Sequence, residues 1–384
     1  MIEEVGLLPY SERLQVLQLT TLAERRSRGD LIEYMGNLAT FPLFLLCIGT
    51  SLSLSCRNLR HETPWYFMFK PPHSVDLFYA DKEKPYLIPH DVDIQSWTNP
   101  IALTMESVYI PGSDPSVNGS LNHFMFNDEV PGGQVSFNHG HTKGAVLFDE
   151  STIVYIIHST PHFPYNNSAG YGFPHKGIYY GQHFFCVTLP IEELSKLLFQ
   201  IRMMWPFVYN FKIQESMYQK YEHLQPIIEG KPLPATAHLH SNVETMSMVD
   251  HTILYAFNKN GTFGADIYDA LISPYFDPPM SLYTETWQNG KSKLHSNCTD
   301  KYFVKNIVYM AFYADHLDYK ESQDHSKWAI SADEKYHFLC FGGVNRMGSQ
   351  FVRGGGMFCF FDDIFWNFMF SAIGMAEDCP GMST

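Results

Sequence analysis

The 384-residue sequence predicts an α/β fold built from two similar halves. Two observations lead to this prediction. Short apolar runs bounded by turn residues alternate with helical segments, and this arrangement occurs twice along the chain. A His-x-Lys motif also occurs twice, as His141-Thr142-Lys143 and as His325-Ser326-Lys327. We expect the first half to span residues 56–215 and the second half residues 216–384, each a mixed β-sheet flanked by helices.

The N-terminal segment has a different character. Residues 1–34 are charged and helical, and a stretch of them resembles the tail of a retrotransposon reverse transcriptase. We interpret them as a spurious or fused leader, with a genuine amphipathic leader as the alternative. Residues 35–55 begin at a second potential start, Met35, and contain an apolar run that ends in a small-x-small site at Ser53-Leu54-Ser55. This run is short for a membrane span, so we expect a signal peptide and no stable membrane association, or a signal anchor if residues 1–34 are translated.

Cysteine content supports secretion. Six cysteines follow the signal peptide, at Cys56, Cys186, Cys298, Cys340, Cys359 and Cys379. An even number in a secreted chain indicates three disulfides formed in an oxidising compartment, although spacing alone leaves every pairing open. Acceptor sites for N-glycosylation fit the same route, at Asn118, Asn166, Asn260 and Asn297.

The body of the chain supplies the expected elements in order. In the first half, apolar runs predict strands at 65–69, 144–148, 153–157 and 184–189. A helix should begin at Pro190, because proline suits the first helical position and acidic residues follow it. In the second half, strands are expected within 243–257 and at 304–313 and 338–341, with helices at 264–271 and 361–373. Polar residues after the strand ending at 157 are candidates for a site at a strand end.

The charge balance argues against a basic nucleic-acid binder at neutral pH. The net charge is −14 when His is neutral, and the chain contains 18 His. Residues 1–55 hold four Arg, six acidic residues and no His, so the remaining chain carries about −12 and would reach about +6 with every His protonated. We therefore expect the protein to meet a polyanion in an acidic compartment.

The two His-x-Lys motifs suggest phosphate chemistry. On a strand, residues two apart face the same side, so each motif pairs an imidazole with an ammonium. Lys supplies positive charge for a phosphate, and His supplies a proton or a nitrogen nucleophile. Two such faces brought together would suffice to cut a phosphodiester without a metal. Spacing alone also fits the plain alternative of two surface dipeptides.

A zinc site is the competing interpretation of the histidines. His139 with His141, and His238 with His240, form His-x-His pairs that can hold zinc on a strand. No carboxylate or Cys cluster accompanies either pair, and the cysteines are expected in disulfides. We therefore expect no metal and no cofactor.

With these motifs in view, the chain resembles the deoxyribonuclease II family, acid endonucleases with a phospholipase D-like fold. The resemblance covers Cys56 to about Met382. Each matching stretch is weak alone, but their order and spacing are specific. They are His141-Thr142-Lys143-Gly144, His158-Ser159 with Pro161, Tyr180-Gly181-Gln182, Asp324-His325-Ser326-Lys327-Trp328, Asn345-Arg346 and Arg353-Gly354-Gly355-Gly356.

The resemblance implies that one chain contains two phospholipase D-like halves arranged as a pseudo-dimer, with the active site at their junction. We expect this chain to be a monomer. It implies metal-independent cleavage of DNA at acid pH, leaving 3′-phosphate and 5′-hydroxyl ends, in a lysosomal or secreted protein. It also implies three disulfides, which join Cys56 with Cys186, Cys298 with Cys379, and Cys340 with Cys359.

The resemblance assigns catalysis to four residues and support to four more. His141 would be the nucleophile and His325 the general acid, or the reverse, with Lys143 and Lys327 holding the phosphate. Ser159, Asn345, Arg346 and Arg353 would orient an imidazole or contact DNA, or serve only the fold.

One departure from the family pattern keeps a second function open. The family usually has Asp where this chain has Gly343. The alternative is therefore a secreted family member that has lost activity and binds polyanions or a host partner. Two intact His-x-Lys motifs favour catalysis.

Overall fold

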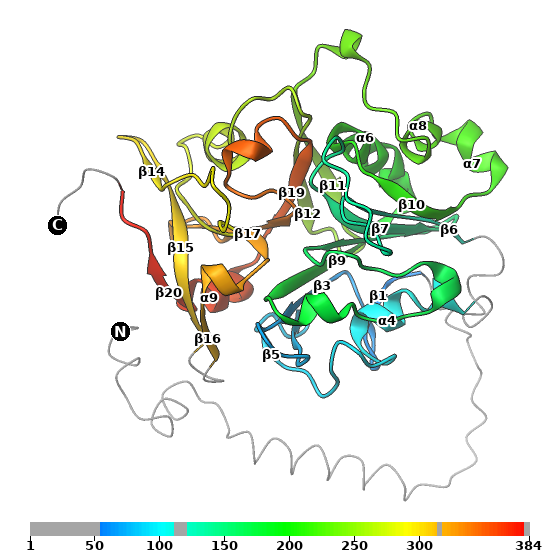
Figure 1. Ribbon diagram of the computed structural model, residues 1–384, viewed down its shortest axis with the longest axis horizontal. Coiled ribbons are helices and arrows are strands. Elements are labelled where there is room, and N and C mark those ends of the chain that lie inside the picture. The colour runs from blue at the N-terminus through cyan, green and yellow to red at the C-terminus, as the bar shows by residue number, and fades with distance from the viewer. Residues whose placement is uncertain (1–53, 111–120, 313–316, 380–384) are drawn as a thin grey trace, which may run out of the picture. The chain divides into compact units, whose positions relative to one another are not determined.

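The computed structural model describes residues 54–110, 121–312 and 317–379. The expected leader, most of the expected signal peptide and Asn118 lie outside the described residues. Two large β-sheets dominate the described part, and Figure 1 draws the first in blue to green and the second in light green to red. Helices are few, and none among the described residues has the length and apolar character needed to cross a membrane.

The first sheet has eight strands in the order β10-β6-β7-β8-β9-β3-β4-β5. Its strands are β3 (Trp65–Lys70), β4 (Phe78–Asp81), β5 (Ile88–Pro89), β6 (Asn122–Asn127), β7 (Lys143–Phe148), β8 (Thr152–His158), β9 (Gln182–Pro190) and β10 (Val208–Lys212). The four strands predicted in this half are present. Every pairing in this sheet is antiparallel, and the parallel pair lies in the second sheet. The chain reverses between β7 and β8 in a tight turn, where Asp149 accepts the backbone N–H groups of Ser151 and Thr152 at 2.8 Å.

The second sheet follows the order β11-β12-β19-β18-β17-β13-β15-β14, with β16 and β20 also paired to β15. Its strands are β11 (Ser241–Ser247), β12 (Ile253–Lys259), β13 (Leu282–Thr286), β14 (Asn297–Cys298), β15 (Phe303–Phe312), β16 (Leu317–Lys320), β17 (Lys327–Ser331), β18 (Phe338–Gly342), β19 (Gly355–Phe361) and β20 (Ile373–Ala376). This sheet is mixed, because β13 and β15 run parallel. A separate two-stranded sheet joins β1 (Cys56–Arg57) to β2 (Glu62–Thr63).

The α-helices are α4 (Pro100–Thr104), α5 (Glu106–Tyr109), α6 (Leu194–Met204), α7 (Glu215–Lys220), α8 (Leu224–Ile228) and α9 (Asp363–Ser371). The helix expected after Pro190 is present, as a 3-10 turn at Ile191–Glu193 that continues into α6. The helix expected at 264–271 is shorter and begins later, as a π-helix at Tyr268–Ile272. Gly264 has φ 74°, a left-handed backbone that cannot begin a right-handed helix.

The two sheets share a strand order. Reading outward, β6-β7-β8-β9-β3-β4 in the first sheet corresponds to β13-β17-β18-β19-β12-β11 in the second. Every neighbouring pair in both series is antiparallel. Lys143 opens β7 and Lys327 opens β17, so the two motifs occupy equivalent places in the two halves.

Aromatic side chains join the two sheets face to face. The ring centroids of Phe67 and Phe341 lie 4.6 Å apart, and those of Tyr155 and Phe358 lie 5.0 Å apart. On β3, Trp65, Phe67 and Phe69 face this shared core, whereas Tyr66 and Met68 face a second core behind the first sheet. The strand is thus buried on both sides, which is why its sequence is a continuous apolar run.

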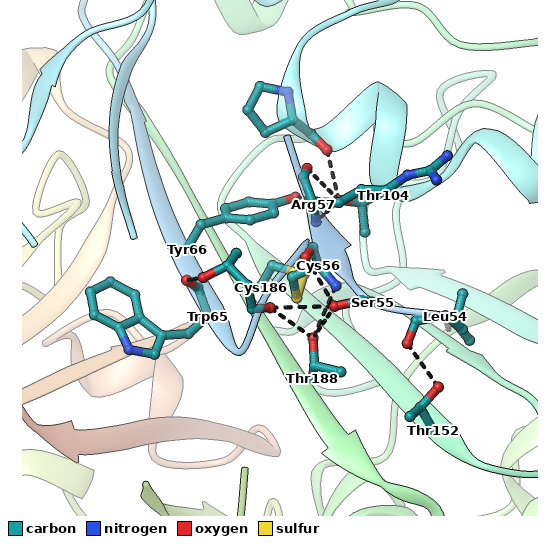
Figure 2. Close-up of a disulfide and its surroundings, with 12 residues drawn as sticks. Leu54, Ser55, Cys56, Arg57, Trp65, Tyr66, Thr104, Thr152, Cys186 and Thr188 are labelled. Atoms are coloured by element: carbon teal, nitrogen blue, oxygen red, sulfur yellow. Dashed lines mark hydrogen bonds between the residues drawn. A yellow bond between two sulfur atoms is a disulfide. The ribbon is translucent and has the colours of Figure 1, made fainter. Parts of the chain in front are cut away.

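All three disulfides join the expected partners. Cys340 and Cys359 face each other across β18 and β19, and Cys298 pairs with Cys379. Figure 2 shows the pair Cys56–Cys186, which ties β1 to β9 across 130 residues. A crosslink over so long a segment restricts the unfolded chain strongly.

The folded body begins before Cys56. Leu54 and Ser55, expected at the end of the signal peptide, are both buried. The Leu54 carbonyl accepts a hydrogen bond from the Thr152 hydroxyl at 2.7 Å, and the Ser55 hydroxyl lies 3.3 Å from that of Thr188 (Figure 2).

Candidate active site

The first His-x-Lys motif lies where the chain enters β7. His141 is buried, and its backbone N–H donates to the Gly354 carbonyl at 2.8 Å. Its ring atom Nδ1 is hydrogen-bonded to the Gly343 carbonyl of the second half. A carbonyl can only accept, so Nδ1 carries the proton and Nε2 has the free lone pair in the neutral ring.

The second motif is held in the same way. Nδ1 of His325 lies 2.8 Å from the Ser159 carbonyl of the first half. The His325 backbone N–H donates to the Gly181 carbonyl at 2.9 Å, and Lys327 Nζ donates to the His325 carbonyl. Nε2 of His325 is therefore also left for chemistry.

The two anchors are reciprocal. Ser159 directly follows β8, and Gly343 directly follows the equivalent strand β18. Each half therefore fixes the imidazole of the other half with a backbone carbonyl. Lys143 and His141 both lower the pKa of His325, after the larger effects of burial and of Lys327, so the two motifs are close enough to interact electrostatically.

Gly343 acts through its backbone. A Cβ atom there would lie 2.5 Å from the His141 carbonyl oxygen and 3.3 Å from Thr142 Cα. The close approach of the two halves thus needs a glycine at this position. The departure from the family pattern leaves the anchor of His141 in place.

A buried carboxylate balances the positive charge of the site. Asp128 lies 2.5 Å from Lys143 Nζ, 3.1 Å from an Arg353 nitrogen and 3.9 Å from Nε2 of His141. Burial raises the pKa of Asp128, but Lys143, His141 and Arg353 outweigh burial and hold that pKa below its usual range. Asp128 therefore stays ionised at acid pH.

Burial sets the titration of both histidines. It lowers the pKa of His141 to about 3, and Asp128 only partly opposes this effect. Burial, followed by Lys327 and Lys143, lowers the pKa of His325 well below its usual value. Burial and Lys143 also lower the pKa of Lys327. All three lowered pKa values mean that added positive charge is disfavoured at these side chains. A bound anion would offset that charge and would therefore be favoured at this site.

The four supporting candidates take different places. The Ser159 hydroxyl donates to Gln182 at 2.6 Å, and its carbonyl anchors His325. Arg353 donates to the His139 carbonyl at 3.0 Å as well as to Asp128. Asn345 is buried two residues beyond the Gly343 anchor, and its side-chain oxygen has no hydrogen-bond partner among the described residues.

Arg346 was expected either to contact DNA or to serve only the fold, and its contacts are structural. Its guanidinium is buried, donates to Asp266 at 2.9 Å and donates to Asn306 at 2.7 Å. These bonds commit the group to the interior of the second half, so it has no face for a DNA backbone. A basic residue beside the motif is here a structural one.

Sequence reasoning missed two residues of the site. Asp128 lies two residues after the apolar run 124–126, so the available signal was a polar residue at the end of a predicted strand. His183 accepts the Lys327 backbone N–H on Nδ1 at 3.2 Å, and burial holds its pKa well below the usual value, which keeps this nitrogen an acceptor. Nothing local in the sequence indicated this contact, because it spans 144 residues.

Two of the histidines considered as zinc ligands are hydrogen-bonded to hydroxyl groups. His139 Nδ1 bonds the Ser136 hydroxyl at 2.6 Å, and His240 Nδ1 bonds that of Thr262 at 2.6 Å. Throughout residues 54–110, 121–312 and 317–379, no group of three or more His, Cys, Asp or Glu is placed to hold a metal ion.

The candidate glycosylation sites differ in access. Asn166 is exposed. Asn260 and Asn297 are half-buried, and their amide nitrogens donate to the Leu239 carbonyl at 2.6 Å and to Asp269 at 2.9 Å. Asn166 is thus the most open of the three described acceptors.

Comparison with known proteins points to one family. The family model for deoxyribonuclease II matches residues 55–379. Plancitoxin-1 of Acanthaster planci is 28% identical over 84% of this chain and 91% of its own length. Cell-death-related nuclease 7 of Caenorhabditis elegans is 29% identical over 86% of this chain and 89% of its own. Deoxyribonuclease-2-alpha of Mus musculus is 28% identical, with coverages of 86% and 95%.

Proposed function

The chain belongs to the deoxyribonuclease II family, and from this premise we propose that it is an acid endodeoxyribonuclease that hydrolyses DNA phosphodiesters. The observation that carries the proposal is the reciprocal anchoring of His141 and His325, which leaves Nε2 of both rings for the reaction. Lys143 and Lys327 bind the non-bridging oxygens and offset charge that develops at phosphorus. The three disulfides fit a lysosomal or secreted enzyme.

We assign the first step to His141. Its Nε2 attacks phosphorus while the bond from phosphorus to the 5′-oxygen breaks. His325 gives its Nε2 proton to that oxygen, which leaves as a 5′-hydroxyl, and the 3′-phosphoryl group stays on His141. In the second step His325 takes a proton from water, the water oxygen attacks phosphorus, and the phosphorus–nitrogen bond breaks. The products are a 3′-phosphate and a free His141.

The titration of the pair explains why acid is required. The nucleophile must be neutral, and a pKa of about 3 keeps His141 neutral at pH 5. The general acid must be protonated, and the lowered pKa of His325 means that protons are needed to charge it. A bound phosphate raises both values, so the two rings titrate as a coupled pair.

The direct experiment is plasmid nicking by the purified, disulfide-bonded protein at pH 5 and pH 7.5 in the presence of a chelator. We expect nicking at pH 5 that persists with chelator and is lost in both His141→Ala and His325→Ala. Acid quenching followed by mass spectrometry identifies which histidine carries phosphate. An intact protein that does not cut DNA at any pH contradicts the proposal and favours a binding protein.

A further inference from the structure

An aromatic pair beside His325 has no part in the reaction proposed above. The ring centroids of Trp287 and His325 lie 5.2 Å apart in an edge-to-face arrangement. Those of Tyr180 and Trp287 lie 4.6 Å apart, also edge to face. The three rings thus form a continuous row that leads away from the catalytic imidazole.

Both outer rings are held by the segments that hold His325. Tyr180 precedes Gly181, whose carbonyl accepts the His325 N–H at 2.9 Å and whose own N–H donates to the Gln323 carbonyl at 2.8 Å. Trp287 directly follows β13, whose last residue pairs with Lys327. One ring therefore comes from each half, and the backbone bonds fix both relative to the site.

The row opens to solvent at its outer end. Tyr180 is 40% exposed and Trp287 is half-buried. Neither ring belongs to the hydrophobic clusters found among the described residues. An exposed aromatic pair at a catalytic group serves the fold poorly, but it offers flat π-surface to a ligand.

We propose that Tyr180 and Trp287 form a stacking subsite for one nucleobase, that of the nucleotide adjoining the scissile phosphate on the His325 side. This inference rests on the proposed nuclease function. His325 faces the phosphate and Trp287 touches His325, so the group that reaches the aromatic row is the base next to that phosphate. Every base has a π-face, so the subsite binds without sequence preference.

The subsite has a consequence for substrate choice. In a duplex the faces of a base are covered by its neighbours, and exposing one costs a few kcal/mol, with the least cost at mismatched or already single-stranded positions. A base in a single strand, at a frayed end or at a mismatch therefore reaches the subsite at a lower cost than a base in regular duplex.

The test uses short single-stranded oligonucleotides in which one phosphodiester is cleavable and the other linkages are methylphosphonates. One version carries a base on each flanking nucleotide, and the others carry an abasic residue on one side or the other. Stacking on an aromatic side chain corresponds to about a 5-fold to 150-fold effect. We expect this loss of kcat/KM from one abasic position only, and a similar loss from Tyr180→Ala on the intact oligonucleotide.

The decisive comparison combines the Tyr180→Ala variant with the abasic oligonucleotide. In Tyr180→Ala the abasic residue should cost much less than in wild type, because one of the two rings that the base would have contacted is gone. Tyr180→Phe and Trp287→Phe keep a ring and should retain most of the effect. Trp97→Ala is the matched control, since Trp97 is 50% exposed and packs edge to face on Tyr109 and Tyr171 instead of on a catalytic ring. A full abasic penalty that persists in Tyr180→Ala overturns the subsite.

A binding measurement separates this inference from the proposed function. Fluorescence anisotropy with a labelled intact or abasic oligonucleotide reports stacking whether or not the chain is cut. Tighter binding of the intact oligonucleotide in wild type, lost in Tyr180→Ala, supports the subsite. Equal binding of the two oligonucleotides by wild type overturns it. Absence of cleavage instead counts against the nuclease activity.

Discussion

Replacing Gly343 by Asp tests whether the backbone or the side chain matters at this position. The family usually carries Asp here, so a side-chain role predicts that Gly343→Asp raises activity. The structure predicts the opposite. The Gly343 carbonyl anchors His141, and a Cβ atom would meet the His141 carbonyl oxygen at 2.5 Å.

The size of the effect follows from that contact. Real Cβ atoms essentially never come closer than 3.0 Å, so the two segments must separate by at least 0.5 Å. A misplacement of about 1 Å at an active site costs about 100-fold in rate. Half of that displacement predicts a loss of about ten-fold or more, and overpacking lowers the free energy of unfolding by about 1–3 kcal/mol.

The assay is the initial rate of plasmid nicking at pH 5, measured with urea unfolding of the same preparations. Gly348→Asp is the matched control, because a Cβ at Gly348 meets no atom closer than 3.5 Å. We expect Gly343→Asp to lose activity and Gly348→Asp to keep it. A Gly343→Asp protein that cuts DNA as fast as wild type, or faster, would refute the backbone argument.

Three further predictions concern buried charges and titrating histidines. The kcat/KM for DNA should fall as pH rises through the lowered pKa of His325, with a midpoint below 6.5, and a midpoint above 7 in a pH–rate profile contradicts this. Asp128→Asn should lower the free energy of unfolding by about 3–5 kcal/mol in urea titrations, because it leaves buried Lys143 without its partner; a change below 1 kcal/mol would show that the pair is not buried in solution. Burial lowers the pKa of His123 from 6.5 to about 4, so the stability it contributes above pH 6.5 is lost as pH falls toward 4, by about 2 kcal/mol at pH 5. His123→Asn should therefore lose less Tm than wild type between pH 7 and pH 5 in thermal melts, and equal losses would exclude His123 as a source of acid sensitivity.

The sequence predicted the site best where reactive residues stand next to an apolar run that indicates a strand. The two His-x-Lys motifs are local, and their positions at the start of β7 and β17 follow from the apolar runs behind them. The buried strand β3 and the strand pair β7 and β8 were predictable from the same kind of pattern. The disulfide pairing was not predictable from spacing and came only from the resemblance.

What the sequence could not predict are contacts between distant segments. Arg346 looked like a DNA contact because it is basic and follows Asn345, but its partner Asp266 lies 80 residues away. Gly343 suggested a loss of activity because the Asp side chain usual in the family is missing. In the structure, the group that contacts His141 is the Gly343 carbonyl oxygen, which belongs to the backbone. Asp128 carries no motif, and only the pairing of β6 with β7 brings it to Lys143.

The exchange of carbonyl anchors between the halves also links the geometry of the site to the order in which the chain is made. A newly made chain presents His141 long before Gly343 has been synthesised, and a folded first half alone would hold that imidazole without its orienting bond. His325 likewise needs the finished first half. Neither ring has its orienting bond until both sheets have closed on each other, so we expect truncated or half-folded chains not to cut DNA. The two anchors would thus couple the proposed activity to the completion of folding.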